Sequence, residues 1–458
     1  MKRWSVARSD PAVASSPAAP AAAVFPARFV LPQAQGPAPS GELLVKKGDR
    51  VVAGQMLFGL HPLPTGSIVV PLHSPVSGKV VDVQPIVGPS GDVAAAVTIE
   101  TDGLGERAEP LTRIWDPHDP AAWPADELRR FIRQAGVTGA PQDGGPGLNA
   151  RLEGGLRGGV LVINAVGCEP GLPSGTLEAA AEPLRLLLGA AALKRAAEAS
   201  EALVVVERGS VADADITQTL SHPELSDSVL DSLRIVHLRN LDWMWAPVLL
   251  AREALAQARL AKNPAVLVEP AGTAVAVGAA LLDGEPLTER LITVRSISGK
   301  IKAVRASLGT PIASLLDAVT DRQGTDGLPN GWTTLLVLAG GPLLGDALAD
   351  LQTPVTKSLP AVSVIRPAVR FRPESPCIRC GRCVEVCPAA LMPLYIARAA
   401  AAGQMAEARA LGAADCVECG ACAYVCPSYR PLLQWIRLAR YGRRKPAGGR
   451  EDAKGADA

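Results

Sequence analysis

The chain has 458 residues, too many for one hydrophobic core, and this length predicts about three or four domains. Its 46 basic and 45 acidic side chains give a formal charge of +1, and no basic stripe interleaved with aromatic residues is present, so nucleic acid is not expected as a partner. No run of about 18 uncharged apolar residues occurs and the N-terminus lacks a continuous apolar core, which predicts a cytoplasmic chain without a transmembrane helix.

The first elements expected along the chain are a tail and a β-rich module. Residues 1–24 are rich in Ala, Pro and Ser, and we expect a disordered leader there. In residues 25–108, short β-type runs alternate with turn signals such as Gly48-Asp49, which predicts an all-β domain. This segment is similar to the barrel-sandwich domains of biotinyl and lipoyl carriers. It has no hairpin of the MKM type, so a swinging-arm carrier is rejected.

The central part of the chain is expected to form two further domains. Within residues 109–270, helical stretches alternate with buried strand-like runs such as GVLVINAVG and EALVVVERG, which predicts an α/β layer with a parallel sheet. Residues 271–355 return to β-type runs with one helix and predict a small β-rich domain. The fold class is therefore a multidomain combination of α/β and all-β modules. Residues 365–441 hold the cysteines, and residues 442–458 are expected to be a disordered tail.

Eight of the nine cysteines fall into two motifs of the same form. The first is Cys377-x2-Cys380-x2-Cys383-x3-Cys387-Pro388, and the second is Cys416-x2-Cys419-x2-Cys422-x3-Cys426-Pro427. Both have the spacing of bacterial two-cluster ferredoxins, in which three closely spaced cysteines bind one cluster and the cysteine before proline binds the other. This spacing assigns one [4Fe–4S] cluster to Cys377, Cys380, Cys383 and Cys426, and the other to Cys416, Cys419, Cys422 and Cys387.

Zinc binding and disulfide bonding fit these cysteines less well. Zinc sites use paired CxxC motifs rather than a triple run followed by Cys-Pro, and disulfides require an oxidising compartment. Cys168 stands alone after a predicted strand and is expected to be a small buried hydrophobe. Two adjacent clusters predict a one-electron conduit rather than a catalytic centre.

The sequence resembles the C subunit of the Rnf (Rsx) electron transport complex over nearly all of the chain expected to be ordered. The resemblance rests on PCIRCGRCVEVCPAALMP, DCVECGACAYVCPSYRPLLQ, VINAVGCEP, GTAVAVGAALLDGEPLTERLITV and LAGGPLLG. It implies a barrel-sandwich module, a Rossmann-like FMN and NADH domain of the complex I flavoprotein type, a β-grasp (SLBB) domain and a dicluster ferredoxin. It also implies other subunits of a membrane complex as partners, a ferredoxin or flavoprotein as redox partner, and a peripheral position on the cytoplasmic side of the inner membrane.

The flavin loop is where the sequence departs from that family. The family's GxGGAGFPT-type run reads GVTGAPQDGGPG here, so Pro141 and Pro146 remove N–H donors and Asp143 adds a negative charge where a phosphate would bind. The family's acidic strand end retains one acid, and the segment 241–247 lacks the usual glycine pair and lysine. The resemblance implies as FMN and NADH contacts Gly136, Gly139, Gly144, Gly145 and Glu169.

Three functions remain open from the sequence. In the first, NADH reduces FMN in the central domain and the clusters pass the electrons on to membrane partners. In the second, the chain is a flavin-free relay or docking subunit that takes electrons from a separate carrier, so its own NADH dehydrogenase activity is uncertain. The third is a flavoprotein similar to cobalamin reductases, which share these modules.

Overall fold

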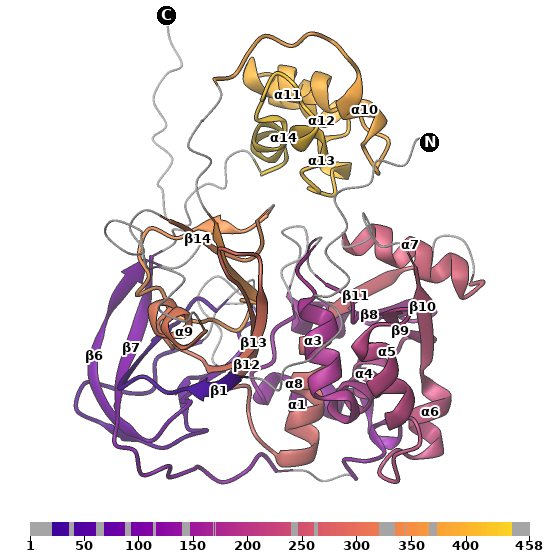
Figure 1. Ribbon diagram of the computed structural model, residues 1–458. Coiled ribbons are helices and arrows are strands. Elements are labelled where there is room, and N and C mark those ends of the chain that lie inside the picture. The colour runs from indigo at the N-terminus through magenta and orange to yellow at the C-terminus, as the bar shows by residue number, and fades with distance from the viewer. Residues whose placement is uncertain are drawn as a thin grey trace, which may run out of the picture. The chain divides into compact units, whose positions relative to one another are not determined.

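The computed structural model divides the chain into two compact units, residues 5–369 and residues 370–458 with the first four, here called the N-terminal and C-terminal units (Figure 1). The structure describes residues 21–35, 41–60, 68–87, 93–112, 116–139, 147–167, 169, 171–239, 246–260, 264–319, 335–342, 344–365 and 373–441. Most of the expected leader and the expected C-terminal tail lie outside these ranges.

The N-terminal unit begins with β-strands that alternate buried and exposed residues. A four-stranded antiparallel sheet has the order β2 (Arg28–Pro32), β7 (Val93–Thr101), β6 (Gly78–Val87) and β3 (Arg50–Val51). Beside it, β4 (Met56–Phe58) pairs with β5 (Leu72–His73). Alternate residues such as Phe29, Leu31, Val97 and Ile99 are fully buried, as expected for a sheet with one face on a core.

The expected leader ends sooner than predicted. Residues 21–24 were assigned to it, but Ala21–Val24 forms β1 and pairs in parallel with β13 (Ile301–Ser307). The strand is held by backbone hydrogen bonds to a partner almost 300 residues away, which the local composition of an alanine-rich stretch does not reveal.

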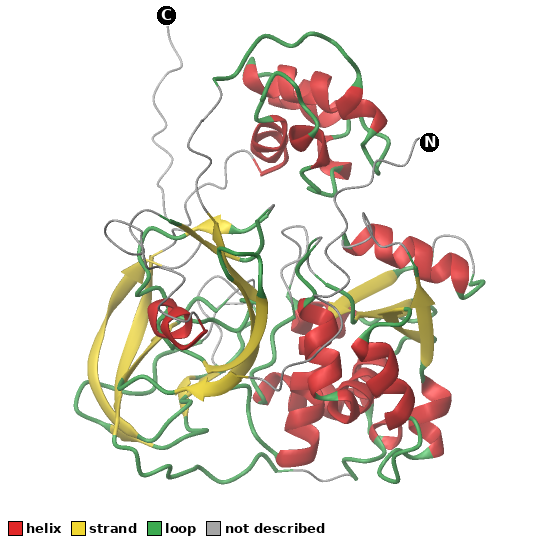
Figure 2. Ribbon diagram, viewed as in Figure 1, coloured by secondary structure: helices red, strands yellow, loops and turns green. Residues whose placement is uncertain are grey.

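The central α/β layer contains the predicted parallel sheet, in the order β10 (Arg234–Leu238), β9 (Glu201–Glu207), β8 (Val160–Asn164) and β11 (Val266–Pro270). Its helices are α1 (Ala125–Gln134), α2 (Leu148–Gly154), α3 (Ser174–Ala181), α4 (Pro183–Ala197), α5 (Val211–Thr219), α6 (Asp227–Ser232), α7 (Pro247–Gln257) and α8 (Ala271–Asp283), with the 3-10 turn η2 (Pro120–Ala122) before α1. Strand residues alternate between a core with α4 and α8 and a smaller core with α7, so helices cover both faces (Figure 2).

Helix α8 was expected to begin the third domain, but it belongs to the α/β core. Its apolar residues are buried in the same cluster as α4 and the strands β8 and β9. The two helices approach so closely that a Cβ on Gly189 would lie 1.8 Å from the carbonyl oxygen of Ala274, and a Cβ on Gly278 would lie 1.9 Å from that of Arg185. Glycine at both crossing positions permits this packing.

The third sheet is mixed and has the order β1, β13, β12 (Glu289–Arg295), β16 (Ala361–Ile365), β14 (Leu336–Ala339) and β15 (Asp346–Ala347). It therefore extends beyond residue 355, the expected end of this domain. Residues of this sheet and of α9 (Ile312–Val319) share one hydrophobic cluster with the first sheet, so the two β modules have a common core.

The C-terminal unit consists of short helices joined by loops (Figure 2). They are α10 (Arg382–Glu385), α11 (Pro393–Ala401), α12 (Met405–Ala410), the 3-10 turn η5 (Ala413–Asp415), α13 (Ala421–Tyr424) and α14 (Leu432–Tyr441). Their apolar faces form a core of Ile396, Ala400, Leu432, Ile436 and neighbouring residues, which two of the cysteines join. In the described ranges no helix is both long and apolar enough to cross a lipid bilayer.

Candidate iron–sulfur site

The two cysteine loops of the C-terminal unit follow the same backbone path. Arg379 and Glu418, each two residues after the first cysteine of its motif, have left-handed φ angles of 55° and 54°. Gly381 and Gly420 also have positive φ angles, of 77° and 70°, and each lies directly before a short helix, α10 or α13. Left-handed backbone is strained for most residues, so its recurrence at matched positions identifies an internal repeat.

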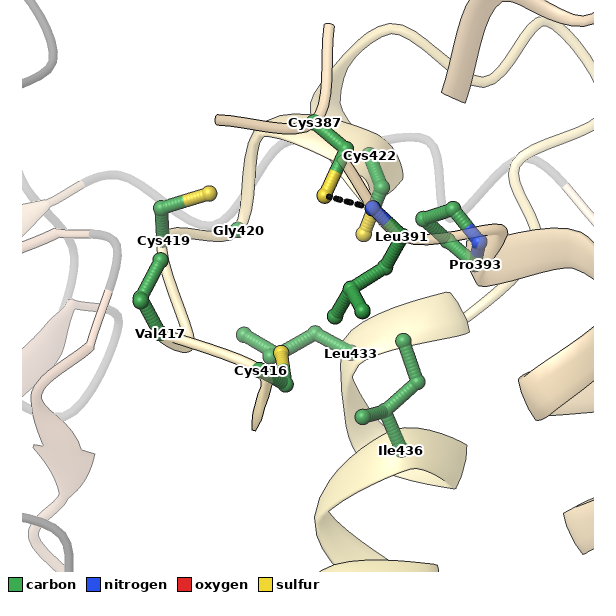
Figure 3. Close-up of a pocket in the computed structure, with 10 residues that line it drawn as sticks. All are labelled: Cys387, Leu391, Pro393, Cys416, Val417, Cys419, Gly420, Cys422, Leu433 and Ile436. Atoms are coloured by element: carbon green, nitrogen blue, oxygen red, sulfur yellow. Dashed lines mark hydrogen bonds between the residues drawn. The ribbon is translucent and has the colours of Figure 1, made fainter. Parts of the chain in front are cut away.

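Four of the cysteines line one pocket (Figure 3). Three come from the second loop, and the fourth, Cys387, comes from the end of the first. Leu391, Val417, Leu433 and Ile436 supply most of the apolar wall. The cysteines at the pocket are the set expected for one cluster, namely Cys387, Cys416, Cys419 and Cys422.

The other expected set also gathers residues from both loops. The thiol of Cys383 is buried, and burial, with a smaller contribution from the charges of Cys426 and Cys377, raises its pKa. Cys377 and Cys380 lie on the exposed part of the first loop. The structure thus brings Cys387, the cysteine before proline of the first motif, to the opposite loop, as in a two-cluster ferredoxin.

The surroundings of the pocket cysteines suit a cationic iron–sulfur core. Burial raises the pKa of Cys419 to about 11 and that of Cys422 to about 12, so without metal these thiols hold their protons at neutral pH. Iron binding then requires proton release, because the thiolate is the form that binds iron. Backbone N–H groups of Leu391 and Glu418 donate to the sulfurs of Cys387 and Cys416, each at 3.4 Å, which favours the thiolate form.

The spacing of the cysteines favours multi-iron clusters over single zinc ions, because zinc sites use paired CxxC motifs rather than a triple run followed by Cys-Pro. The structure adds that four of the cysteines, from both loops, line one pocket. The eight cysteines therefore fit two cubane clusters.

The residues expected to contact FMN or NADH are placed differently. Gly139 packs so tightly on the Arg151–Glu269 ion pair that a Cβ there would lie 2.5 Å from Oε2 of Glu269. Glu169 is 6% exposed, and its Oε1 accepts a hydrogen bond from the backbone N–H of Leu344 at 3.0 Å. Gly144, Gly145, Cys168 and most of the 241–247 segment lie outside the described residues.

Gly136 lies at a junction of three modules. Its carbonyl oxygen accepts a hydrogen bond from Nζ of Lys357 at 2.7 Å, and the same amine donates to the carbonyl of Pro71 at 2.6 Å. Lys357 is fully buried, which sequence reasoning missed because lysine is almost always exposed. The buried ion pair of Glu269 was missed as well, although an acid at the end of an apolar strand, VLVEP, was the available signal.

We predict that Gly136→Ala destabilises the N-terminal unit by about 3 kcal/mol or more, combining left-handed strain with overpacking. A Cβ would lie 2.8 Å from Nζ of Lys357 and 2.9 Å from the carbonyl oxygen of Pro71. Gly103→Ala is the control, because Gly103 has a similar φ of 71° but no atom within 4 Å of the added carbon. Urea unfolding should show a clearly larger loss for Gly136→Ala, and equal losses would contradict the close contact.

Comparison with known proteins identifies two domains in this chain. Residues 14–104 match the RnfC barrel sandwich hybrid domain, and residues 376–430 match a 4Fe-4S dicluster domain. The first match begins inside the segment expected to be a leader. Among solved structures, an air-oxidised NAD+-reducing [NiFe]-hydrogenase aligns with a TM-score of 0.42 and 14% identity, covering 70% of this chain and 63% of that one. Such a likeness is too weak to assign a fold or an activity.

Relatives of known name match most of this chain. The C subunit of the ion-translocating oxidoreductase complex of Erwinia tasmaniensis is 34% identical over 435 residues, covering 90% of this chain and 50% of the relative. The proteins of the same name from Serratia proteamaculans and Citrobacter koseri are 31% and 32% identical, covering 81% and 90% of this chain and 51% and 56% of themselves. The chain thus spans about half the length of the curated relatives it matches. The resemblance is confirmed: this chain carries an RnfC barrel sandwich hybrid domain and a 4Fe-4S dicluster domain, and it is similar over most of its length to the C subunits of ion-translocating oxidoreductase complexes.

Proposed function

We propose that the chain is an iron–sulfur electron-transfer subunit of an Rnf-type ion-translocating oxidoreductase complex. The observation that carries the proposal is the pocket lined by Cys416, Cys419 and Cys422 of the second loop together with Cys387 of the first, within a pair of repeated loops. Two [4Fe–4S] clusters held side by side form a path for single electrons. The names of the relatives support the assignment to such a complex.

The residues of this chain hold and tune the clusters in this proposal. The eight cysteines are the ligands, and bound clusters would supply one-electron redox chemistry. The backbone N–H groups of Arg379, Leu391 and Glu418 donate to sulfur, and such hydrogen bonds favour the reduced, more negative state. Apolar side chains of the pocket wall keep water away from the second cluster.

The domain identities implied by the resemblance remain part of the proposal. We assign residues 25–108 to the barrel-sandwich module, the central layer through α8 to a Rossmann-like domain of the FMN and NADH type, and the third sheet to an SLBB-type β-grasp domain. Other subunits of a membrane complex and a ferredoxin or flavoprotein are the proposed partners. A peripheral position on the cytoplasmic side of the inner membrane is proposed with them.

The source of the electrons separates two forms of the function. NADH oxidation through FMN requires the central domain to bind both molecules, whereas a relay receives electrons from another protein. The contacts of Gly139 with Glu269 and of Glu169 with Leu344 favour the relay, because protein groups already occupy these two implied contacts. A flavoprotein of the cobalamin-reductase type is the third candidate and also requires bound flavin.

Anaerobic purification tests the proposal through metal, flavin and reduction measured on one sample. We expect about eight irons and eight acid-labile sulfides per chain, as two [4Fe–4S] clusters require, and bleaching of the cluster absorbance by dithionite. The relay predicts no released flavin and no bleaching by NADH. Stoichiometric FMN with bleaching by NADH would establish the dehydrogenase form, and flavin without NADH response would favour the third candidate. Iron below about two per chain would contradict the electron-transfer function itself.

A further inference from the structure

The two cysteine loops share a backbone path but differ in exposure. In the first loop Cys377 and Cys380 are exposed, and so are the residues between them, with Ile378 exposing 68% of its surface. In the second loop Cys416 is half-buried, Cys419 is only 7% exposed, and Val417 is half-buried. The two cluster positions therefore share a backbone path but differ in how much solvent reaches their cysteines.

The two repeats also differ in sequence at positions that wall the pocket of the second loop. The two motifs are separated by 39 residues, as Cys377 and Cys416 show. Leu391 and Ile436 help to wall the pocket of the second loop. The residues at the same repeat offset from them are Arg430 and Ala397, a charged and a small side chain in place of two large apolar ones, whereas Leu433 of the wall has the apolar counterpart Leu394. Arg430 is ion-paired with Glu374 at 2.9 Å.

We infer that the cluster position of Cys377, Cys380, Cys383 and Cys426 is the one that exchanges electrons with a partner protein, and that the position of Cys387, Cys416, Cys419 and Cys422 is internal. The inference rests on the proposed electron-transfer function. The exchange moves one electron between the cluster and the partner's redox centre, so that one is oxidised and the other reduced, without a bond or a proton being transferred. A partner can approach sulfur most closely at the exposed segment 376–380.

The difference in solvent exposure also predicts which of the two clusters has the lower reduction potential. A reduced cluster with four thiolates carries an additional negative charge, which apolar, water-poor surroundings disfavour. The internal position, walled by Leu391, Leu433 and Ile436, therefore has the lower potential. In a partly reduced chain the electron resides mainly at the exposed position.

The chemistry around Ile378 indicates the kind of partner. The side chains of Arg379 and Arg382 are exposed beside it, and neither forms an ion pair with another residue in the described ranges. The two exposed acids nearest to Ile378 in sequence are Glu374, which forms an ion pair with Arg430, and Glu385 on α10. Within the described residues, this surface thus combines an exposed apolar residue with two guanidinium groups that form no ion pair there. It fits a small one-electron carrier protein whose redox centre is surrounded by acidic residues.

Electron paramagnetic resonance with a water-soluble dysprosium chelate tests the exposure of each cluster in the full chain. Cys419→Ala retains the exposed cluster and Cys380→Ala retains the internal one. We expect the chelate to shorten spin relaxation in reduced Cys419→Ala at least severalfold more than in Cys380→Ala. If a variant loses both clusters, the unaltered chain reduced with less than one equivalent of dithionite should show the strong effect. Equal effects at the two positions would overturn the inference.

The partner chemistry has its own test by stopped-flow mixing. The dithionite-reduced full chain is mixed with an acidic flavodoxin or with basic cytochrome c. Arg379→Glu with Arg382→Glu should slow transfer to flavodoxin at least tenfold at low salt and should not slow transfer to cytochrome c. Arg252→Glu with Arg259→Glu, two exposed arginines of the N-terminal unit, makes the same change in net charge and should alter both rates less than twofold. Two results would overturn the assigned partner chemistry. One is equal slowing by the two pairs of substitutions. The other is that, after correction for driving force, the unaltered chain reacts faster with cytochrome c than with flavodoxin.

These outcomes are separable from the proposed function. Assembly of two reducible clusters is established by iron analysis and dithionite bleaching before either test. A chain that passes those measurements but shows equal relaxation at both positions retains its electron-transfer function and loses only the inferred exchange site.

Discussion

Replacing Cys387 with alanine is expected to remove the cluster of the second cysteine loop and leave the cluster of its own loop in place. Cys387 follows the first motif in sequence, but its side chain lies at the pocket lined by Cys416, Cys419 and Cys422 (Figure 3). A cubane that loses one of four thiolate ligands is incompletely held and prone to loss of iron. The iron content should fall from about eight to about four per chain.

The matched variants are Cys416→Ala and Cys377→Ala. Cys387→Ala and Cys416→Ala should lose the same paramagnetic resonance signal after dithionite reduction, and Cys377→Ala should lose the other. The far-UV circular dichroism of the whole chain should change little in all three, since residues 5–369 form a separate compact unit and supply most of the regular structure. Uncrossed ligation would give the opposite pairing, with Cys387→Ala and Cys377→Ala sharing a lost signal.

The second large effect is expected at Lys357, where the stability of the N-terminal unit should depend on pH. Burial lowers the pKa of this lysine from 10.5 to about 7, because the ammonium form loses its hydration. Between these two values the unfolded chain binds a proton that the folded unit does not hold. The free energy of unfolding therefore rises from pH 7 to pH 10.5, by an amount on the order of 5 kcal/mol.

Lys357→Met should abolish this rise while retaining most of the buried stem. The carbonyls of Pro71 and Gly136 lose their donor, which costs roughly 1–3 kcal/mol each at every pH. Lys79→Met, at an exposed lysine on β6, is the control and should keep the slope of the unaltered chain. Unfolding followed by tryptophan fluorescence from pH 7 to 10.5 measures the difference. A slope that survives in Lys357→Met would contradict a buried, deprotonating amine.

His73, which lies beside Lys357, also lowers the free energy of unfolding as the pH falls, but in a more acidic range. Burial, and then the charge of Lys357, lower the pKa of His73 from 6.5 to about 3. The unfolded chain binds more protons between these values, so stability is lost as the pH falls from 6.5 to 3. Lys357→Met removes the positive charge that helps to lower the pKa of His73, so the loss of stability between pH 6.5 and pH 3 should be smaller in this variant.

Local sequence was sufficient for the elements whose structure depends on nearby residues. The cysteine spacing, with glycine before each short helix, predicted the two loops because neighbouring residues define their backbone path. The parallel sheet was predictable because β8 and β9 are continuous apolar runs and β10 is a third strand-like run, separated by helical stretches.

Features that depend on distant partners were not predictable in this way. Strand β1 consists mostly of alanine, which has low strand propensity, and it exists because β13 offers an open edge. Helix α8 follows Pro270 and looks like the start of a new domain, but Gly189 and Gly278 let it pack tightly on α4. The fully buried Lys357 has no local signal, because its two acceptors come from other modules.

For the clusters, the sequence by itself determined which cysteines are available and which pairing of loops to expect, since ligand spacing is a property of neighbouring residues. Only the tertiary structure decided that one set lies in an apolar pocket and the other at an exposed loop. Leu391 and Ile436, from before α11 and from α14, wall the pocket of one set, whereas Cys377, Ile378 and Cys380 of the other set are exposed. Solvent cover depends on packing between separate segments, and the cysteine motifs carry no information about it.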